Sequence, residues 1–221
     1  MGMTRFIVAL LAVSFLGLTD ARAASFTISG GTGHLTPLDD SGSGYPWLGN
    51  QIIPLTPGFL GAQLLFRGHS GRLYDITFEF VGFEAAWADN ELRTTGGNIS
   101  DRDPVGSSVA VRWLATGGLD RVPFSFMNGD PDGPLGVANG ANTLPGFGLP
   151  NFFLSISDPL ADPASDREGH VVVLALDDHG AGPDVDHDDW VGFVRAERVP
   201  EPSILLLVGS GLLAIARRRR R

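Results

Sequence analysis

The sequence contains no cysteine and no lysine among its 221 residues. Without cysteine, the chain cannot form disulfides, use a thiol nucleophile or hold zinc through Cys ligands. Without lysine, it cannot contain the phosphate-binding loop GxxxxGK[ST] or a Schiff-base lysine. Neither a GxSxG nucleophile elbow nor an HExxH pair occurs in the sequence. These absences exclude several common enzyme classes.

Positive charge is also scarce in the part of the chain that is expected to fold. Residues 24–199 contain 9 Arg against 23 Asp and Glu, a net formal charge of −14, whereas the whole chain carries −9. Such an acidic surface repels nucleic acid and anionic lipid, and it favours cations or neutral ligands such as sugars. We therefore expect no nucleic-acid partner.

Helical periodicity is rare, and alternation at period two predicts strands instead. Tyr74, Ile76, Phe78 and Phe80 alternate with polar residues, which predicts a half-buried strand. The continuous apolar run at 171–176 predicts a strand that is buried on both faces. Further strands are predicted at 25–29, 63–67, 109–113, 122–127, 152–156 and 190–196.

About eight short strands joined by Gly, Pro and Asp turns predict an all-β fold. We expect a single antiparallel β-sandwich, jelly-roll or immunoglobulin-like, over residues 24–198. Residues 84–92 alone show a possible helical period. The long Gly/Pro-rich connections at 30–61 and 128–150 are predicted to be loops at the ends of the sandwich, where ligands commonly bind.

The N-terminal segment, residues 1–23, has the features of a cleavable signal peptide. Arg5 supplies the positive start, residues 6–18 form an apolar run, and a small-x-small pattern ends at Ala23. Cleavage is therefore expected between Ala23 and Ala24. A transmembrane or buried helix is the alternative, but a run of 13 residues is too short to span a bilayer.

The C-terminal segment, residues 199–221, combines three features in a fixed order. Pro200, Glu201 and Pro202 form an extended unit, because a residue that precedes proline is held out of the helical region. Residues 203–216 then predict a short transmembrane helix of about 21 Å, which needs some thinning of the bilayer. An arginine cluster anchors its far end on the cytoplasmic side: Arg217, Arg218, Arg219, Arg220 and Arg221.

This order of a Pro-Glu-Pro unit, a Leu/Gly-rich apolar segment and a terminal arginine cluster resembles the PEP-CTERM sorting signal. The resemblance covers residues 199–221. It implies that the tail is the substrate of an exosortase, a membrane-embedded cysteine transpeptidase or protease, which recognises Pro200, Glu201 and Pro202. It also implies an exported bacterial protein that is held transiently in the inner membrane and then reaches the cell surface or extracellular matrix.

The resemblance further implies processing by an exosortase and an association with exopolysaccharide or biofilm, while the N-terminal small-x-small pattern predicts processing by signal peptidase. Because no catalytic motif is present, we expect a non-enzymatic binding or structural module. A secreted polysaccharide-active hydrolase or lyase is the alternative, since β-sandwiches also carry such enzymes. Paired carboxylates for glycoside hydrolysis cannot be singled out from the sequence.

Six carboxylates lie within thirteen residues, between the predicted strands at 171–176 and 190–196. Asp184, Asp186 and Asp188 alternate, which directs oxygen ligands to one side, as a Ca²⁺ site requires. A solvated acidic turn is the other interpretation. The remaining members of this acidic cluster are Asp177, Asp178 and Asp189.

A second segment copies the opening of a calcium loop, with Asn128, Asp130, Asp132 and Gly133 at the expected spacing. Its twelfth position is Asn139 instead of the bidentate Glu that such a loop uses. Asn, Asp, Pro and Gly are also ordinary turn residues. We therefore favour a turn at this position.

Overall fold

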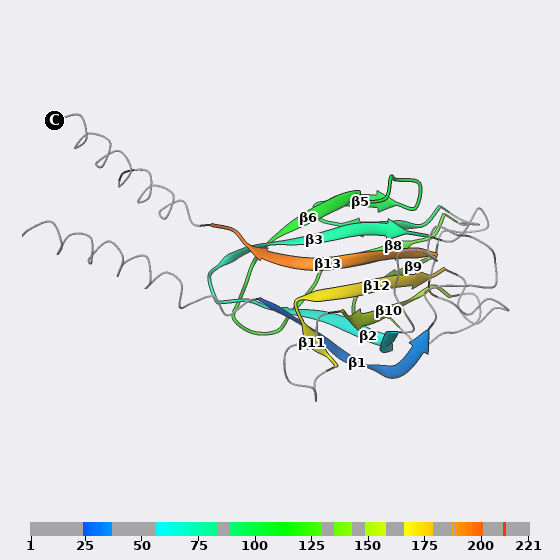
Figure 1. Cartoon of the computed structure of the whole chain (residues 1–221), viewed down its shortest axis with the longest axis horizontal. Coiled ribbons are helices and arrows are strands. Elements are labelled where there is room, and N and C mark those ends of the chain that lie inside the picture. Colours follow the sequence, from blue (N-terminus) through cyan, green and yellow to red (C-terminus); the bar gives the residue numbers. More distant parts are fainter. Residues whose placement is uncertain are drawn as a thin grey trace, which may run out of the picture.

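The computed structural model describes residues 24–36, 56–83, 89–129, 135–142, 149–157, 166–178, 187, 189–200 and 210. In these ranges the assembled elements are antiparallel β-strands arranged in two sheets (Figure 1). The all-β prediction is therefore confirmed. No helix within the same ranges is long and apolar enough to cross a bilayer. The predicted leader and, apart from Ser210, the apolar stretch 203–216 lie outside the described residues.

The larger sheet, sheet A, contains nine of the described strands, and β7 (Asp120–Arg121) pairs with β2 beside the main path. Along that path the order is β11 (Glu168–Gly169), β1 (Ser25–Thr36), β2 (Thr56–Arg67), β10 (Asn151–Ile156), β12 (Val171–Asp177), β13 (Trp190–Arg198), β3 (Leu73–Gly82) and β6 (Ser108–Leu114).

The smaller sheet, sheet B, contains four of the described strands. Their order is β5 (Gly97–Ser100), β4 (Glu91–Thr94), β8 (Phe124–Met127) and β9 (Gly136–Ala138).

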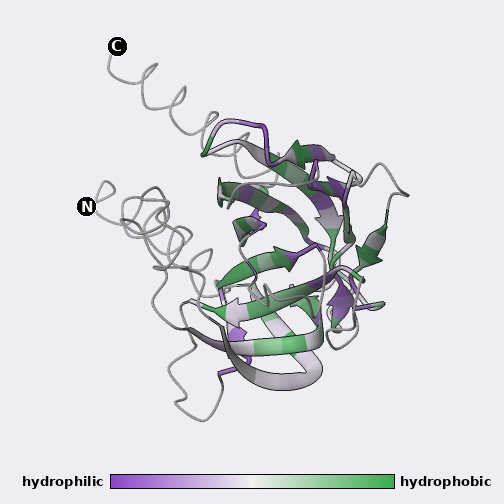
Figure 2. Cartoon of the chain, turned by 90° about the vertical axis from the view of Figure 1, so that its right-hand side faces the viewer, coloured by the Kyte–Doolittle hydropathy of each residue, from purple (hydrophilic) through white to green (hydrophobic). Residues whose placement is uncertain are grey.

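Buried aromatic side chains join the two sheets in one core. Phe124 and Phe126 of sheet B contact Phe78, Phe152 and Trp190 of sheet A, with ring centroids 5.2 to 6.2 Å apart. Such pairs add tilted and edge-to-face contacts to a large buried apolar area. Green and paler bands alternate along the strands in Figure 2, as expected for strands that bury one face.

The central strands of sheet A are buried on both faces. All six residues of β10 are buried, as are the last six of β12. The prediction for 171–176 is therefore confirmed, and the predicted strand at 152–156 is likewise buried on both faces. A second apolar cluster on the other face of sheet A explains this, and it consists of Leu60, Phe153, Val173, Ala175 and Val191.

Three predicted boundaries are wrong. The predicted loop at 128–150 contains strand β9 (Gly136–Ala138), which pairs with β8. Leu92 lies in strand β4, so the end of the possible helix at 84–92 is extended, while residues 84–88 lie outside the described residues. The predicted loop at 30–61 is partly strand, because β1 and β2 remain paired as far as Thr36 and Thr56. Positive φ angles at Gly30, Gly31 and Gly61 let this glycine-rich ribbon continue through a bend.

Two asparagine side chains satisfy the backbone of β2 where it lacks a neighbouring strand. The Oδ1 of Asn139 accepts from the Leu64 N–H at 2.8 Å, and its Nδ2 donates to the carbonyl oxygens of Leu64 and Val122, each at 2.7 Å. The Nδ2 of Asn142 donates to the carbonyl oxygens of Ala62 and Phe152 at 3.1 and 2.8 Å. These amides act as the missing strand between β10 and β7.

Replacing Asn139 with Ala should therefore destabilise the protein strongly. Three buried hydrogen bonds disappear and leave backbone groups of Leu64 and Val122 without partners, so we expect a loss of about 2 to 4 kcal/mol in the free energy of unfolding. Urea denaturation of the mature protein measures this loss. The matched control is Asn98→Ala at an exposed position, which should change stability by less than about 0.5 kcal/mol. Equal effects of the two variants would contradict the bridging role.

Candidate functional site

The chain enters and leaves the folded body at the same end. Ser25 at the start of β1 pairs with Arg67 at the end of β2, and a short turn leads from there to Leu73 at the start of β3. The N–H of Val199 donates to the Leu73 carbonyl oxygen at 2.9 Å. We call this end, at the left of the body in Figure 1, the proximal end.

The opposite end of the body, which we call the distal end, is where strands β1, β3 and β12 end. Thr36 pairs with Thr56 there, and Asp177 pairs with Asn151. β3 ends at this side of the sheet, where Gly82 pairs with Val191. The distal end is therefore opposite the end at which Ser25 and Val199 lie.

A buried polar cluster, the distal polar cluster, links the two sheets at this end. The backbone N–H of Asn90, just before β4, donates to Asp101 Oδ2 at 2.8 Å, and its Nδ2 donates to Asp178 Oδ2 at 2.9 Å. Asp101 follows β5, and Asp178 follows β12. All three side chains are at most 4% exposed. The hairpin of sheet B is thus tied to the central strand of sheet A.

Asn128 and Asp189 complete the distal polar cluster. The Nδ2 of Asn128 donates to the Asp178 carbonyl oxygen at 3.3 Å, while its Oδ1 accepts from the Leu135 N–H at 2.8 Å. The N–H of Asp178 donates to Asp189 Oδ2 at 2.8 Å. The buried Asp178 carboxylate therefore has a donor in Asn90 Nδ2, and the backbone N–H and carbonyl oxygen of the same residue are hydrogen-bonded as well.

One acceptor in the distal polar cluster is left over. Asn90 is fully buried, and its Oδ1 has no hydrogen-bond partner among the residues that the structure describes. If the Asn90 amide were rotated by half a turn, its oxygen would face the Asp178 carboxylate and the two acceptors would repel. The hydrogen bond from Nδ2 to Asp178 therefore determines which amide atom is the oxygen. A buried amide oxygen without a donor is a natural ligand for a water molecule or a hard cation.

Burial raises the pKa of Asp101 above its ordinary value, because the charged form is disfavoured away from water. Hydrogen bonds from the Asn90 N–H and the Ser100 hydroxyl oppose this rise without cancelling it. Because the folded pKa is raised, ionisation of Asp101 opposes folding. Its contribution to stability therefore decreases as the pH rises from the ordinary value of 3.8 through the folded pKa.

A separate polar group lies on the outer face of sheet A. Asn151 Nδ2 donates to Asp177 Oδ2 at 3.2 Å, and His187 Nε2 lies 2.8 Å from Asn151 Oδ1. Since that amide already donates through Nδ2, its oxygen accepts, and His187 carries a proton on Nε2. The His187 ring also packs on Phe153 at 5.8 Å between centroids.

Only three of the six aspartates of the predicted acidic cluster are among the described residues. Asp177, Asp178 and Asp189 are held in hydrogen bonds within the body, while Asp184, Asp186 and Asp188 lie outside the described residues. Within the described part of the chain, no three His, Asp or Glu side chains are placed to hold a metal ion. In the second segment, Asn128 and Asn139 are engaged with the body, and Asp130 and Asp132 lie outside the described residues.

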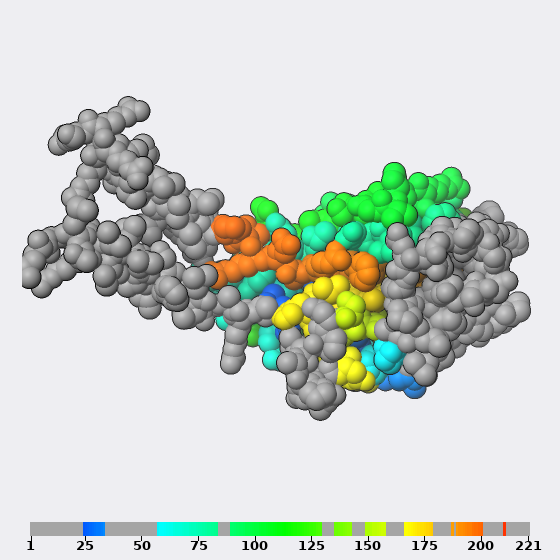
Figure 3. Space-filling model, viewed as in Figure 1, coloured from blue at the N-terminus to red at the C-terminus, as the bar shows by residue number. Residues whose placement is uncertain are grey.

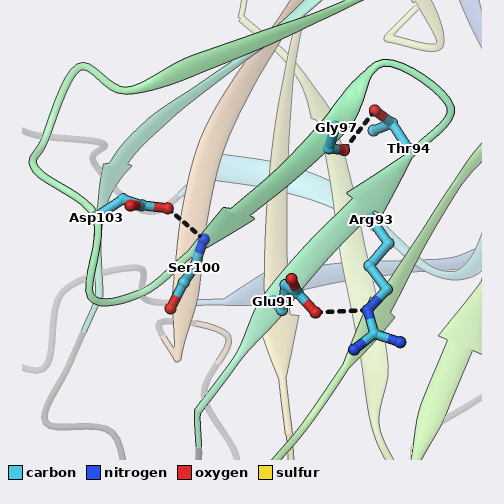
Figure 4. Close-up of polar contacts among 6 residues, drawn as sticks. All are labelled: Glu91, Arg93, Thr94, Gly97, Ser100 and Asp103. Atoms are coloured by element: carbon cyan, nitrogen blue, oxygen red, sulfur yellow. Dashed lines mark hydrogen bonds and ion pairs between the residues drawn. The ribbon is translucent and has the colours of Figure 1, made fainter.

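A hollow of about 290 Å³ opens beside the distal polar cluster on sheet B. Two ion pairs cross it, between Arg93 and Glu91 at 2.5 Å and between Arg102 and Asp89. Figure 4 shows the first of these pairs on strand β4, together with the Ser100 N–H that donates to Asp103. The hollow is lined by Asp89, Glu91, Arg93, Ser100, Arg102, Met127, Asn128 and Gly129.

The C-terminal segment is similar to a known sorting motif. A family model described as the PEP-CTERM protein-sorting motif matches residues 198–221. The chain carries a PEP-CTERM sorting motif. This motif implies an exported protein that is processed by an exosortase. No curated protein and no solved structure matches the chain.

The PEP-CTERM motif begins where the described body ends. Pro200 is exposed just after β13, whereas Glu201, Pro202 and the arginines at 217–221 lie outside the described residues. At the other terminus, Ala24 is described and its carbonyl oxygen lies 2.8 Å from His170 Nδ1, while Ala23 lies outside the described residues. The cleavage between Ala23 and Ala24 stays a prediction.

Substitutions of Asp101 test the distal polar cluster. Asp101→Asn keeps an acceptor for the Asn90 N–H and removes a buried charge, so its melting temperature at pH 7 should equal or exceed that of the wild type. Asp101→Ala should lose about 1 to 3 kcal/mol, because it leaves that N–H unsatisfied. Thermal melts of the mature proteins at pH 5 and pH 7 measure both effects. If Asp101→Asn is as unstable as Asp101→Ala, the charge itself is required.

Proposed function

We propose that this PEP-CTERM protein is a non-enzymatic binding or structural module, delivered by exosortase processing to the cell surface or the extracellular matrix. The observation that supports this most is the common position of both chain ends. Because Ser25 and Val199 lie at the proximal end, a tail held in the membrane leaves the distal end facing outward. While the tail is inserted, the protein presents its distal end to its surroundings.

We further infer that residues 24–198 form a single β-sandwich. The support is the shared aromatic core, in which Phe124 and Phe126 of sheet B meet Phe78 and Trp190 of sheet A. Two sheets that bury their inner faces against each other are the usual way for such strands to exclude water. A rigid body of this kind holds the loops at its ends in place.

Exopolysaccharide is the ligand class that we propose for the distal end. The sequence segments that join described strands there contain aromatic residues, namely Tyr45, Trp47, Trp87 and Phe147. Aromatic rings next to polar side chains can contact the apolar face and the hydroxyls of a sugar. The net charge of −14 over residues 24–199 also favours a neutral glycan over a polyanion.

The sorting role of the tail is tested by changing Glu201. Glu201→Ala should leave the protein in the membrane fraction, because the exosortase loses the acidic side chain between two prolines. Fractionation and immunoblotting in the native host measure the ratio of released to membrane-bound protein. The strain without its exosortase should retain wild type and variant alike. Release of the variant at the wild-type level would overturn the role of the Pro-Glu-Pro unit.

We also propose that Asp184, Asp186 and Asp188 contribute to a Ca²⁺ site near the distal end. Neighbouring carboxylates repel one another unless a cation or water screens them, and the buried Asn90 Oδ1 at this end has no hydrogen-bond donor among the residues that the structure describes. A cation that binds only the folded chain raises its stability by mass action. Calcium would then fasten the connection between β12 and β13.

Calcium should raise the melting temperature of the mature protein. At a concentration one hundred times the dissociation constant, the expected gain is about 2.7 kcal/mol, and magnesium should give less. Melts in calcium, magnesium and chelator provide the comparison. The triple variant Asp184→Asn, Asp186→Asn, Asp188→Asn should lose the response. Identical melting temperatures in calcium and chelator would show that the segment is a solvated turn.

A further inference from the structure

The last row of sheet A at the proximal end is apolar. Val199 extends β13 by one residue, since its N–H donates to the Leu73 carbonyl oxygen at 2.9 Å after Arg198 has paired with Tyr74. Leu73 in turn pairs with Leu114 on the edge strand β6. Directly opposite residues lie on the same face of a sheet. Val199, Leu73 and Leu114 therefore form one row across three strands, which we call the terminal row.

The terminal row faces away from the core. Leu73 and Leu114 are 41% and 60% exposed, whereas Tyr74, the next residue on β3, is 2% exposed. The following row on the same face is charged, with Arg112 paired to Asp75 at 3.0 Å and Glu197 opposite Asp75. Apolar exposure on these three strands is thus concentrated where the sorting tail begins. Figure 3 shows this face, with the orange β13 running to the left-hand end of the body.

The short chain between Val199 and the apolar stretch limits how far the terminal row can lie from the membrane. Three residues, Pro200 to Pro202, separate Val199 from the apolar stretch that starts at Ser203. Four extended residue steps cover at most about 14 Å. The polar interfacial layer of a bilayer is roughly 5 to 8 Å thick on each side. When the tail is inserted, the terminal row is therefore held at or just above the lipid headgroups.

We propose that the terminal row rests against the lipid surface of the membrane until the tail is cleaved. This inference depends on the membrane-inserted tail of the proposed function. The exposed side chains of Leu73 and Leu114, with the half-buried Val199 beside them, suit the boundary between headgroups and acyl chains. Arg72 and Arg198, which adjoin Leu73 and Val199 in the sequence, bring positive charge to this end of an otherwise acidic body.

The terminal row is too small to hold the body on a membrane by itself. Even a single fourteen-carbon acyl chain gives only marginal, reversible membrane binding. The row therefore orients the body while the tail is present, with the proximal end down. Once the exosortase has removed the tail, the terminal row alone is too weak to keep the body at the lipid surface.

Single-cysteine variants test this contact, because the chain contains no other cysteine to be labelled. Leu114→Cys reports on the terminal row, and Val105→Cys is the matched control, 63% exposed in the turn before the opposite end of the same edge strand. Each mature protein, tail included, is labelled with a fluorophore and reconstituted in phosphatidylethanolamine and phosphatidylglycerol vesicles with brominated acyl chains. The probe at position 114 should be quenched at least twofold more than the probe at 105.

A third variant, Leu206→Cys, reports on insertion of the tail itself. Strong quenching at 206 and equal, weak quenching at 114 and 105 would overturn the proposed lipid contact and leave membrane anchoring intact. Absence of quenching at 206 would overturn anchoring, and with it the basis of the lipid contact. Quenching at 206 and at 114, but not at 105, is the result expected.

Discussion

On one edge of strand β2, two short partner strands leave a gap in which the backbone N–H and C=O groups of β2 have no neighbouring strand to bond. β10 pairs with it at Leu60 and β7 pairs with it at Leu65, so the residues between need other hydrogen-bond partners. The amides of Asn139 and Asn142 supply them. Because Asn139 follows β9 directly, the same bonds fix the edge of sheet B to the middle of sheet A. Asparagine side chains thus take the place of a partner strand along this part of β2. The relative position of the two sheets, and with it the distal polar cluster, depends on these hydrogen bonds.

The sequence predicts the strands that bury one continuous face, and it predicts the short ones poorly. β3 and β12 were identifiable because six or more residues repeat a single pattern. β4 and β5 have four residues each and place only Leu92 and Ile99 in the core, which is too few to show a period. The Gly-rich end of β1 looked like a loop, since glycine has no side chain to carry the alternation.

The candidate site was predictable only in part, for a different reason. The run of aspartates at the end of β12 is visible in the sequence. Which of these aspartates bond within the body is not, because Asp178 accepts its hydrogen bond from Asn90, 88 positions away. Asn90 and Asp101 flank the short β4–β5 hairpin, where Asn and Asp are common turn residues, so in the sequence alone nothing distinguishes them from an ordinary turn. Their structural use becomes evident only when the two sheets are brought together. The sorting tail is the opposite case, since its signal is contiguous and needs no fold to be read.

The meeting of both chain ends at one side of the body affects the order of events during export. In the proposed route of export, a newly translocated chain would be tethered at two points, by the predicted leader before Ala24 and by the sorting tail after Val199, and both tethers would belong to the same membrane. The two predicted cuts would then lie beneath the same end. The body need not turn over between the first cut and the second, and β1 and β13 can complete their pairing while each is still attached.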